Sequence, residues 1–217
     1  MERPKRLFRK ASNSARKEVE TLIEQAKASG ELDLAGRNLA GADLSKLNLR
    51  QADLRWANLR GTNFAGADLS QADLSQANLT EAGLVEANLS QANLSYADLS
   101  QANLRQANLN QVKLTRAILR WADMQGVNLS QANLNEADVR YAILVRADLS
   151  QARLNRANLY KADLTRASLH KAELTGSELR EAILVETDMA GSDINIAKLE
   201  WSNPQADHEL ERGIRLK

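Results

Sequence analysis

One spacing governs most of this chain: from Leu34 to Leu199 a large aliphatic residue or Phe stands at every fifth position, without insertion. This makes 34 consecutive five-residue units, 29 of them centred on Leu. Ala stands two residues before the centre in 25 units, and Asp or Asn stands directly before it in 24. A period of five fits neither an α-helix, which repeats every 3.6 residues, nor a continuous strand, which repeats every two. The chain must therefore be built from short, repeated pieces.

Each unit has the pattern of a very short strand followed by a turn. Ala and the central Leu are two residues apart, so they point to the same side of an extended segment and the residue between them points to the other. The two residues after the centre are mostly small or polar, which suits a turn. Strands and turns of constant handedness wind into a solenoid whose coils bury their interior only against neighbouring coils. We therefore expect Leu and Ala inside and Asp or Asn outside.

A longer spacing indicates how many units make one coil. Gln recurs at intervals of twenty residues in the second position after the centre, at Gln51, Gln71, Gln91, Gln111, Gln131 and Gln151. Identical amides on successive coils can form hydrogen bonds along a stack. Twenty residues per coil, and hence four sides, is the natural interpretation.

These residues resemble the pentapeptide-repeat family, whose motif is A-(D/N)-L-x-x. The clearest matches are "AGADLSQADLSQANL" at 65–79 and "SQANLSYADLSQANLRQANL" at 90–109. The resemblance implies a right-handed quadrilateral β-helix, so the expected fold is an all-β solenoid of about 8.5 coils, roughly 40 Å long. We expect the β-helix over residues 31–201, a basic tail and capping helix over 1–30, and a C-terminal tail or short cap over 202–217.

The N-terminal cap is predicted from helical spacing. Stacked coils leave open strand edges at both ends, which invite aggregation unless they are covered. Over residues 12–29, Ala15, Val19, Leu22 and Ile23 lie on one side of a helix. A helix packed on the first coil is the expected role, with a partner-binding or membrane-surface helix as the alternative.

The sequence contains no recognisable catalytic constellation. It has no Cys, and its two His residues, His170 and His208, cannot be placed beside a nucleophile or a metal ligand from spacing. We therefore expect no enzyme activity, no metal and no cofactor. No run of 18 apolar residues predicts a membrane span, and the N-terminus lacks the apolar segment of a secretory signal. A cytoplasmic location is expected.

Two departures from the repeat are the strongest functional signal. The sequence "AILV" at 142–145 and 182–185 keeps the inward Ala and Leu but replaces both outward positions, at Ile143, Val145, Ile183 and Val185. Forty residues is two coils, so the two pairs should lie on one face about 10 Å apart. Clustered exposed apolar groups usually mark a contact surface. The alternative is that Ile and Val, which are good strand formers, are merely tolerated outside.

Arginines and aromatic residues are predicted beside this face. The corner positions of three successive coils hold Arg120 and Trp121, then Arg140 and Tyr141, then Tyr160, and Ile118 lies on the neighbouring face. Arg and aromatic residues are typical anchors of protein interfaces. The alternative is that these large side chains only shield the coil surface. The predicted partner-binding residues are Ile118, Arg120, Trp121, Arg140, Tyr141, Ile143, Val145, Tyr160, Ile183 and Val185.

The leading functional hypothesis is a non-enzymatic regulatory or scaffold module that binds another protein, of unknown identity, through the surface of a rigid rod. The resemblance suggests an alternative, a DNA mimic that inhibits DNA gyrase or topoisomerase. Such mimicry needs a strongly negative rod, whereas residues 113–171 carry 10 Lys or Arg against 5 Asp or Glu. A purely structural homodimeric rod is the third possibility, and binding to nucleic acid is not expected. Long proteins of this type are abundant in cyanobacteria, so the resemblance favours a regulatory role there.

Overall fold

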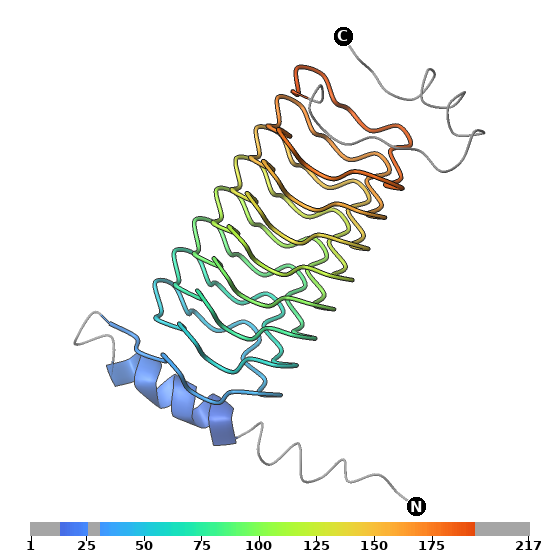
Figure 1. The fold of residues 1–217 in the computed structure, drawn as a ribbon. Helices are drawn as coiled ribbons and strands as arrows, with labels where there is room; N and C mark the ends of the chain where they lie inside the picture. Colours follow the sequence, from blue (N-terminus) through green and yellow to red (C-terminus); the bar gives the residue numbers. More distant parts are fainter. Residues whose placement is uncertain (1–13, 26–30, 194–217) are drawn as a thin grey trace, which may run out of the picture.

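A computed structural model of the chain describes residues 14–25 and 31–193. Among these residues, one helix, at 14–25, lies across one end of a straight rod made of stacked, rectangular coils (Figure 1). Sheet hydrogen bonding is reduced to isolated bridges, one residue wide, at every fifth position. The described part of the rod holds about eight coils, at about 4.8 Å per coil.

The parallel bridges confirm the twenty-residue coil. Every residue directly before a centre, from Asp33 to Ser168, bridges the residue twenty positions later. The bridges form four columns, which we call faces 1 to 4; the columns start at Asp33, Asn38, Asp43 and Asn48 respectively. The corner that follows each face is given the same number. Because the column positions repeat without a break, any outward residue can be assigned to a face by its number alone.

The interior consists almost entirely of the predicted Leu and Ala side chains. The central Leu residues of the coils are fully buried, and the Ala residues two positions earlier are buried with them. Backbone hydrogen bonds connect neighbouring coils at every side; for example, the Leu74 N–H donates to Asn93 O at 2.7 Å and the Asn93 N–H donates to Ala72 O at 2.9 Å. Thr62 occupies an inward Ala position without loss, since its hydroxyl donates to Leu39 O at 2.7 Å.

The corners impose a backbone conformation that the repeat pattern does not reveal. The second corner residue has φ between 54° and 73° at every corner from Gly36 to Gly191. The residue after it donates its N–H to the preceding centre, as Ala102 does to Leu99 O at 3.0 Å. This geometry is that of a type II turn, which requires positive φ at its third residue. Among the corners from Gly36 to Gly191, no β-branched residue occupies this position, in keeping with the steric penalty such residues meet there.

The predicted glutamine ladder forms along corner 4. Gln51 donates its Nε2–H to Gln71 Oε1 at 3.0 Å, and the same bond continues from Gln71 to Gln91 and from Gln91 to Gln111, at 2.9 and 3.2 Å. A fourth bond of 2.9 Å connects Gln111 to Gln131. Five side chains are thus joined along the rod, which confirms the interpretation of the twenty-residue spacing.

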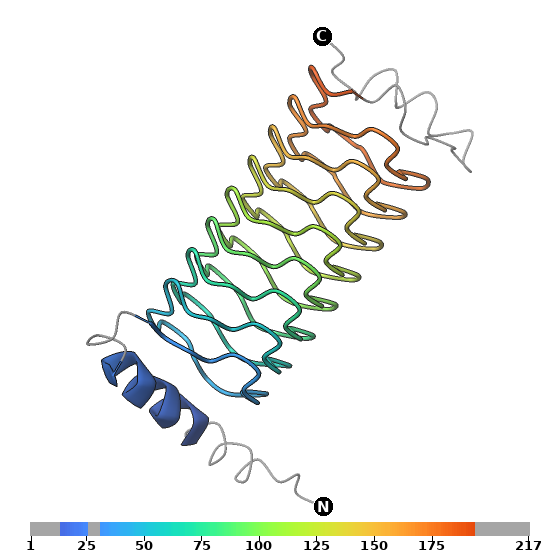
Figure 2. The same cartoon turned by 60° about the vertical axis from the view of Figure 1, so that its left-hand side comes forward.

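The helix at 14–25 covers the first coil, as predicted (Figure 2). Val19 is fully buried against the core, and Ala15, Leu22 and Ile23 pack beside it. The Arg16 guanidinium donates to the backbone carbonyls of Asp43 and Ser45, at 3.0 and 3.2 Å. The cap therefore combines apolar contact with hydrogen bonds to the coil edge. The predicted basic tail, the last units of the repeat and the C-terminal tail at 202–217 lie outside the described residues.

Candidate functional site

The Asp and Asn residues before each centre serve the fold directly. Their side-chain oxygen accepts a hydrogen bond from the backbone N–H two residues later, as Asp123 does from Gln125 at 3.2 Å and Asp163 from Thr165 at 3.0 Å. An Asn can also donate to the residue twenty positions earlier. Ile143 and Ile183 occupy this position but have no oxygen to accept such a bond. The "AILV" segments therefore lack an interaction that most of the coils use.

Ile143 and Ile183 lie on face 3, two coils apart. Both bridge to Asp163 on the coil between them, which puts their backbones about 10 Å apart. Their exposed fractions are 44% and 47%, and Val185 at the adjacent corner is 45% exposed. Val145 is half-buried. We call these four side chains, Ile143, Val145, Ile183 and Val185, the apolar strip.

Three aromatic side chains meet at corner 2, which borders face 3. The Trp121 and Tyr141 rings are stacked, with centroids 4.1 Å apart and planes inclined by 7°. Tyr160 meets Tyr141 edge to face at a centroid distance of 5.7 Å. Trp121 remains 57% exposed. The sequence prediction that successive coils bring these residues together is correct, and we call them the aromatic corner.

The two predicted arginines share one carboxylate. Arg120 donates its Nε–H to Asp138 Oδ2 at 2.5 Å, and Arg140 forms a bidentate pair with Asp138 through two bonds of 2.8 Å. Burial alone would raise the pKa of Asp138, but the hydrogen bonds from Arg140 and Arg120 outweigh it and the pKa lies below its usual value of 3.8. The cationic character expected beside the aromatic corner is thus partly neutralised. Ile118 lies directly below Asp138 on face 2 and is half-buried.

Tyr160 is fixed by a polar contact as well as by its ring. Its hydroxyl donates to Glu181 Oε1 at 2.8 Å, and the same carboxylate lies 3.2 Å from Lys161 Nζ. These two bonds, the Tyr160 one first, hold the pKa of Glu181 below its usual value. Because the tyrosine is tied to the next coil, the aromatic corner is a rigid feature of the surface.

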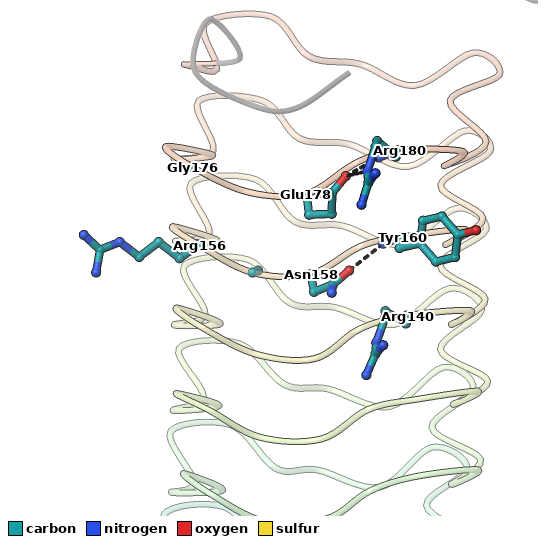
Figure 3. A pocket seen from close by; sticks show the side chains of 8 residues that line it. Arg140, Arg156, Asn158, Tyr160, Gly176, Glu178 and Arg180 are labelled. Carbon is teal, nitrogen blue, oxygen red and sulfur yellow. Dashed lines mark hydrogen bonds and ion pairs between the residues drawn. The ribbon is translucent and has the colours of Figure 1, made fainter. Parts of the chain in front are cut away.

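A shallow hollow of about 370 Å³ opens on face 2 beside Tyr160 (Figure 3). Gly176 contributes to it because a glycine stands where other coils have a long corner side chain. The Arg180 guanidinium is engaged by Glu178, and Arg156 points away from the rod. The hollow is open and polar, and it offers no pair of convergent groups for catalysis.

Two exposed aromatic residues were not among the sequence predictions. Trp56 and Tyr96 both stand at the second position of corner 1, forty residues apart, and are 54% and 53% exposed. Each lies under a guanidinium: Arg55 is 5.1 Å from the Trp56 ring centroid, and Arg116 is 5.8 Å from that of Tyr96. The signal in the sequence was their shared column, and it has the same forty-residue spacing as "AILV".

Within residues 14–25 and 31–193, no group of three or more His, Asp or Glu side chains is arranged to hold a metal ion. No helix in that part of the chain is long and apolar enough to cross a membrane. His170 lies half-buried at corner 4, whereas His208 lies outside the described residues.

Comparisons with known proteins agree with this architecture. A family model described as pentapeptide repeats matches residues 31–66, 57–95, 92–131, 132–170 and 164–203. Together, the coil geometry and these matches define a right-handed quadrilateral β-helix with an N-terminal helical cap. The chain belongs to the pentapeptide-repeat family.

Several solved structures are similar to the chain. HetL, a pentapeptide-repeat protein involved in heterocyst differentiation regulation in the cyanobacterium Nostoc, is 33% identical over 82% of this chain and 91% of its own, with a TM-score of 0.33. Full-length QnrB1, a plasmid-mediated fluoroquinolone resistance protein, is 19% identical over 84% and 99%, with a TM-score of 0.41. A thylakoid-lumen protein of Arabidopsis thaliana is 30% identical over 49% and 70%, with a TM-score of 0.36. Comparison with curated protein sequences finds no match.

Proposed function

We propose that this chain is a non-enzymatic regulatory or scaffold module that binds another protein through the apolar strip and the aromatic corner. The observation that carries the proposal is the chemistry at Ile143 and Ile183. Each replaces a hydrogen-bonding residue of the fold with an apolar side chain that is nearly half exposed. A typical hydrogen bond contributes about 1 kcal/mol to stability, and the strand preference of Ile at most offsets that loss, so the coil gains no stability from either substitution.

The surroundings of the strip have the composition of an interface. Apolar side chains at its centre are bordered by the stacked rings of Trp121 and Tyr141. Arg120 and Arg140 lie beyond the rings and are held by Asp138. Trp, Tyr and Arg provide most of the binding energy in many protein interfaces, and side chains already fixed by neighbours lose little entropy on binding.

The test is to restore the usual residue at both positions, in the variant I143N/I183N. Asn should accept the N–H of the residue two positions later, as Asn78 does from Thr80 at 3.0 Å, so the fold is preserved while the apolar strip is removed. The tagged wild-type rod and the variant are used to capture proteins from a native lysate. We expect the variant to lose the captured partner at unchanged thermal stability.

A matched control is available on face 1. Lys113 is also a departure from Asp or Asn at the position before a centre, and it lies far from the strip. K113N makes the same kind of repair and should leave capture unchanged. Equal capture by I143N/I183N and the wild type would refute the proposal.

A further inference from the structure

Face 3 differs between its two halves in a way that makes it complementary to itself. The C-terminal half carries the protruding Ile143 with Val145 beside it. The N-terminal half carries Gly83 in the same column, three coils away, with Val85 beside it. Gly83 has no side chain to project from the face, and a Cβ added there would meet Asn63 Oδ1 in ordinary van der Waals contact at 3.6 Å. One half of the face therefore has a protrusion where the other has a recess.

Corner 3, at the edge of this face, carries charges with no ion-pair partner among the described residues. They are Lys46, Glu86 and Arg146, all exposed. Their signs alternate along the rod, with the acid between the two bases. Unsatisfied charges of both signs in one column can be paired by a second copy that runs in the opposite direction.

Two rods packed with their faces 3 together can be related by a two-fold axis that lies between the faces and runs perpendicular to the rods. This axis makes the rods antiparallel, so the order of the coils is reversed. Each corner of one rod then lies opposite the same corner of the other. With the axis midway between the coils of Asn103 and Asp123, Ile143 of one copy meets Gly83 of the other. Val145 then meets Val85. By symmetry each contact occurs twice, so the protrusion of each rod enters the recess of its partner.

The same register also pairs opposite charges along corner 3. Arg146 lies opposite Glu86, and Lys46 lies opposite Glu186, which is itself bound to Arg166. At corner 2, Tyr141 lies opposite Glu81, where its hydroxyl can donate to the carboxylate.

Ile183 comes to lie opposite Asp43. The carboxylate of Asp43 is engaged within its own rod, because it accepts from the N–H of Ser45 at 3.1 Å and from Asn63 at 3.0 Å. The charge opposite this end of the strip is thus already hydrogen-bonded.

Other arrangements of the two rods bring like charges together. A parallel pair related by an axis along the rod places Lys161 beside Arg166 and Glu81 beside Glu86. Antiparallel pairs shifted by one coil have like side chains on the axis. A shift in one direction places Arg105 opposite itself, and a shift in the other does so with Asp123; within each rod these two side chains form an ion pair at 3.5 Å. Like charges in contact oppose association and select against the wrong partner geometry. Among these alternatives, the register with the axis between Asn103 and Asp123 alone avoids such contacts.

We propose that the partner of face 3 is a second copy of this chain, packed antiparallel and face to face in this register. This inference rests on the proposed function and names the partner of the same surface. Overlap of the coils from Asp43 to Ile183 gives a contact about 34 Å long and about 16 Å wide. Its projected area of about 540 Å² per rod corresponds to a small, reversible interface.

The test uses engineered cysteines, because the chain has none of its own. Two single variants, V85C and V145C, are purified, mixed at high concentration and treated with a short bismaleimide. A linker is needed because sheets packed face to face lie about 10 Å apart, whereas a disulfide needs Cα atoms within about 7 Å. In the proposed dimer residue 85 of one rod faces residue 145 of the other, whereas residue 145 lies about three coils, or about 14 Å, further along the rod from its own twin. We therefore expect covalent dimers in the mixture and none in either variant alone.

Charge exchange provides a second measurement that does not depend on cysteine chemistry. R146E places two acids opposite each other on both sides of the axis and should weaken self-association by about tenfold, as judged by analytical ultracentrifugation. R146E combined with E86R restores opposite charges and should recover the wild-type association. R116E on corner 1 is the matched control, and we expect it to leave association unchanged.

Each contrary outcome is informative. Crosslinked dimers formed by V145C alone would show an antiparallel pair whose axis passes through the coil of Val145, and would overturn the register. A monomer at every concentration, without crosslinked dimers in the mixture, would overturn the dimer. The proposal that face 3 binds another protein would then be judged separately, by whether I143N/I183N loses a partner captured from lysate.

Discussion

The residue directly before each centre is Asp or Asn in most units because its side-chain oxygen accepts a backbone hydrogen bond. Replacing Asn by Ile at one such position, and Ile by Asn at another, tests how much this hydrogen bond stabilises the coil. Asn88 on face 4 makes three side-chain hydrogen bonds: it accepts from the Ser90 N–H at 3.2 Å, accepts from Asn108 at 3.2 Å and donates to Asp68 at 3.1 Å. Each partly exposed bond contributes about 0.5–1 kcal/mol. Ile recovers up to about 1 kcal/mol through its preference for strands. N88I should therefore lower the free energy of unfolding by about 1–2 kcal/mol.

The reverse exchange, I143N, should have little effect or a small stabilising one. The new side chain gains the N–H of Val145 as donor and Asp123 as acceptor, while it loses the partial burial of Ile143. We expect a change of less than about 1 kcal/mol in the free energy of unfolding. Both variants are compared with the wild type by urea denaturation, followed by circular dichroism and by Trp fluorescence. An unchanged midpoint for N88I, or a loss above about 2 kcal/mol for I143N, would refute the reasoning.

Three further predictions follow from the backbone, the charges and the core. Q101V should destabilise the rod by about 1–2 kcal/mol because a β-branched residue is strained at positive φ. Q101G should be neutral or stabilising by up to about 1 kcal/mol. Thermal melts of the two variants and the wild type measure the difference. The pKa of Asp138 in the folded protein lies below 3.8. The stability that the Asp138 carboxylate contributes is therefore present above pH 3.8 and is lost as the pH falls through the pKa of the folded state. Carboxyl carbon NMR of Asp138 should show the lowered pKa, and R140Q should raise this pKa toward 3.8. L104A, at a fully buried position, should cost about 2–5 kcal/mol in chemical denaturation, and a loss below about 1 kcal/mol would contradict the packed interior.

Much of the fold followed from the sequence because the repeat is strict. The five-residue period gave the inward Leu and Ala, and the spacing of the glutamines gave the twenty-residue coil. Since a solenoid contains only near-neighbour contacts, assigning Ile143 and Ile183 to one face needed only counting. The stacking of Trp121 on Tyr141 follows from the same column arithmetic.

Other features depend on side-chain and backbone geometry that a pattern does not contain. The side-chain oxygen of Asp or Asn accepts a hydrogen bond from the backbone N–H two residues later, as Asp123 does from Gln125. This bond explains the preference for these residues, whereas periodicity shows only that the position points outward. The sharing of Asp138 by Arg120 and Arg140 depends on rotamers, and it changes the charge expected beside the aromatic corner. Trp56 and Tyr96 share a column of corner 1 by the same count, but the cations over their rings, Arg55 and Arg116, depend on rotamers.

The most direct test of the central claim, that face 3 is a protein-contact surface, is photo-crosslinking in living cells. A benzophenone amino acid replaces Val185, which is 45% exposed at the end of the apolar strip, and in a control chain it replaces Ser90 at corner 4. Illumination should give discrete protein adducts from position 185 and none from position 90. The same adducts from both positions, or none from position 185, would contradict the account.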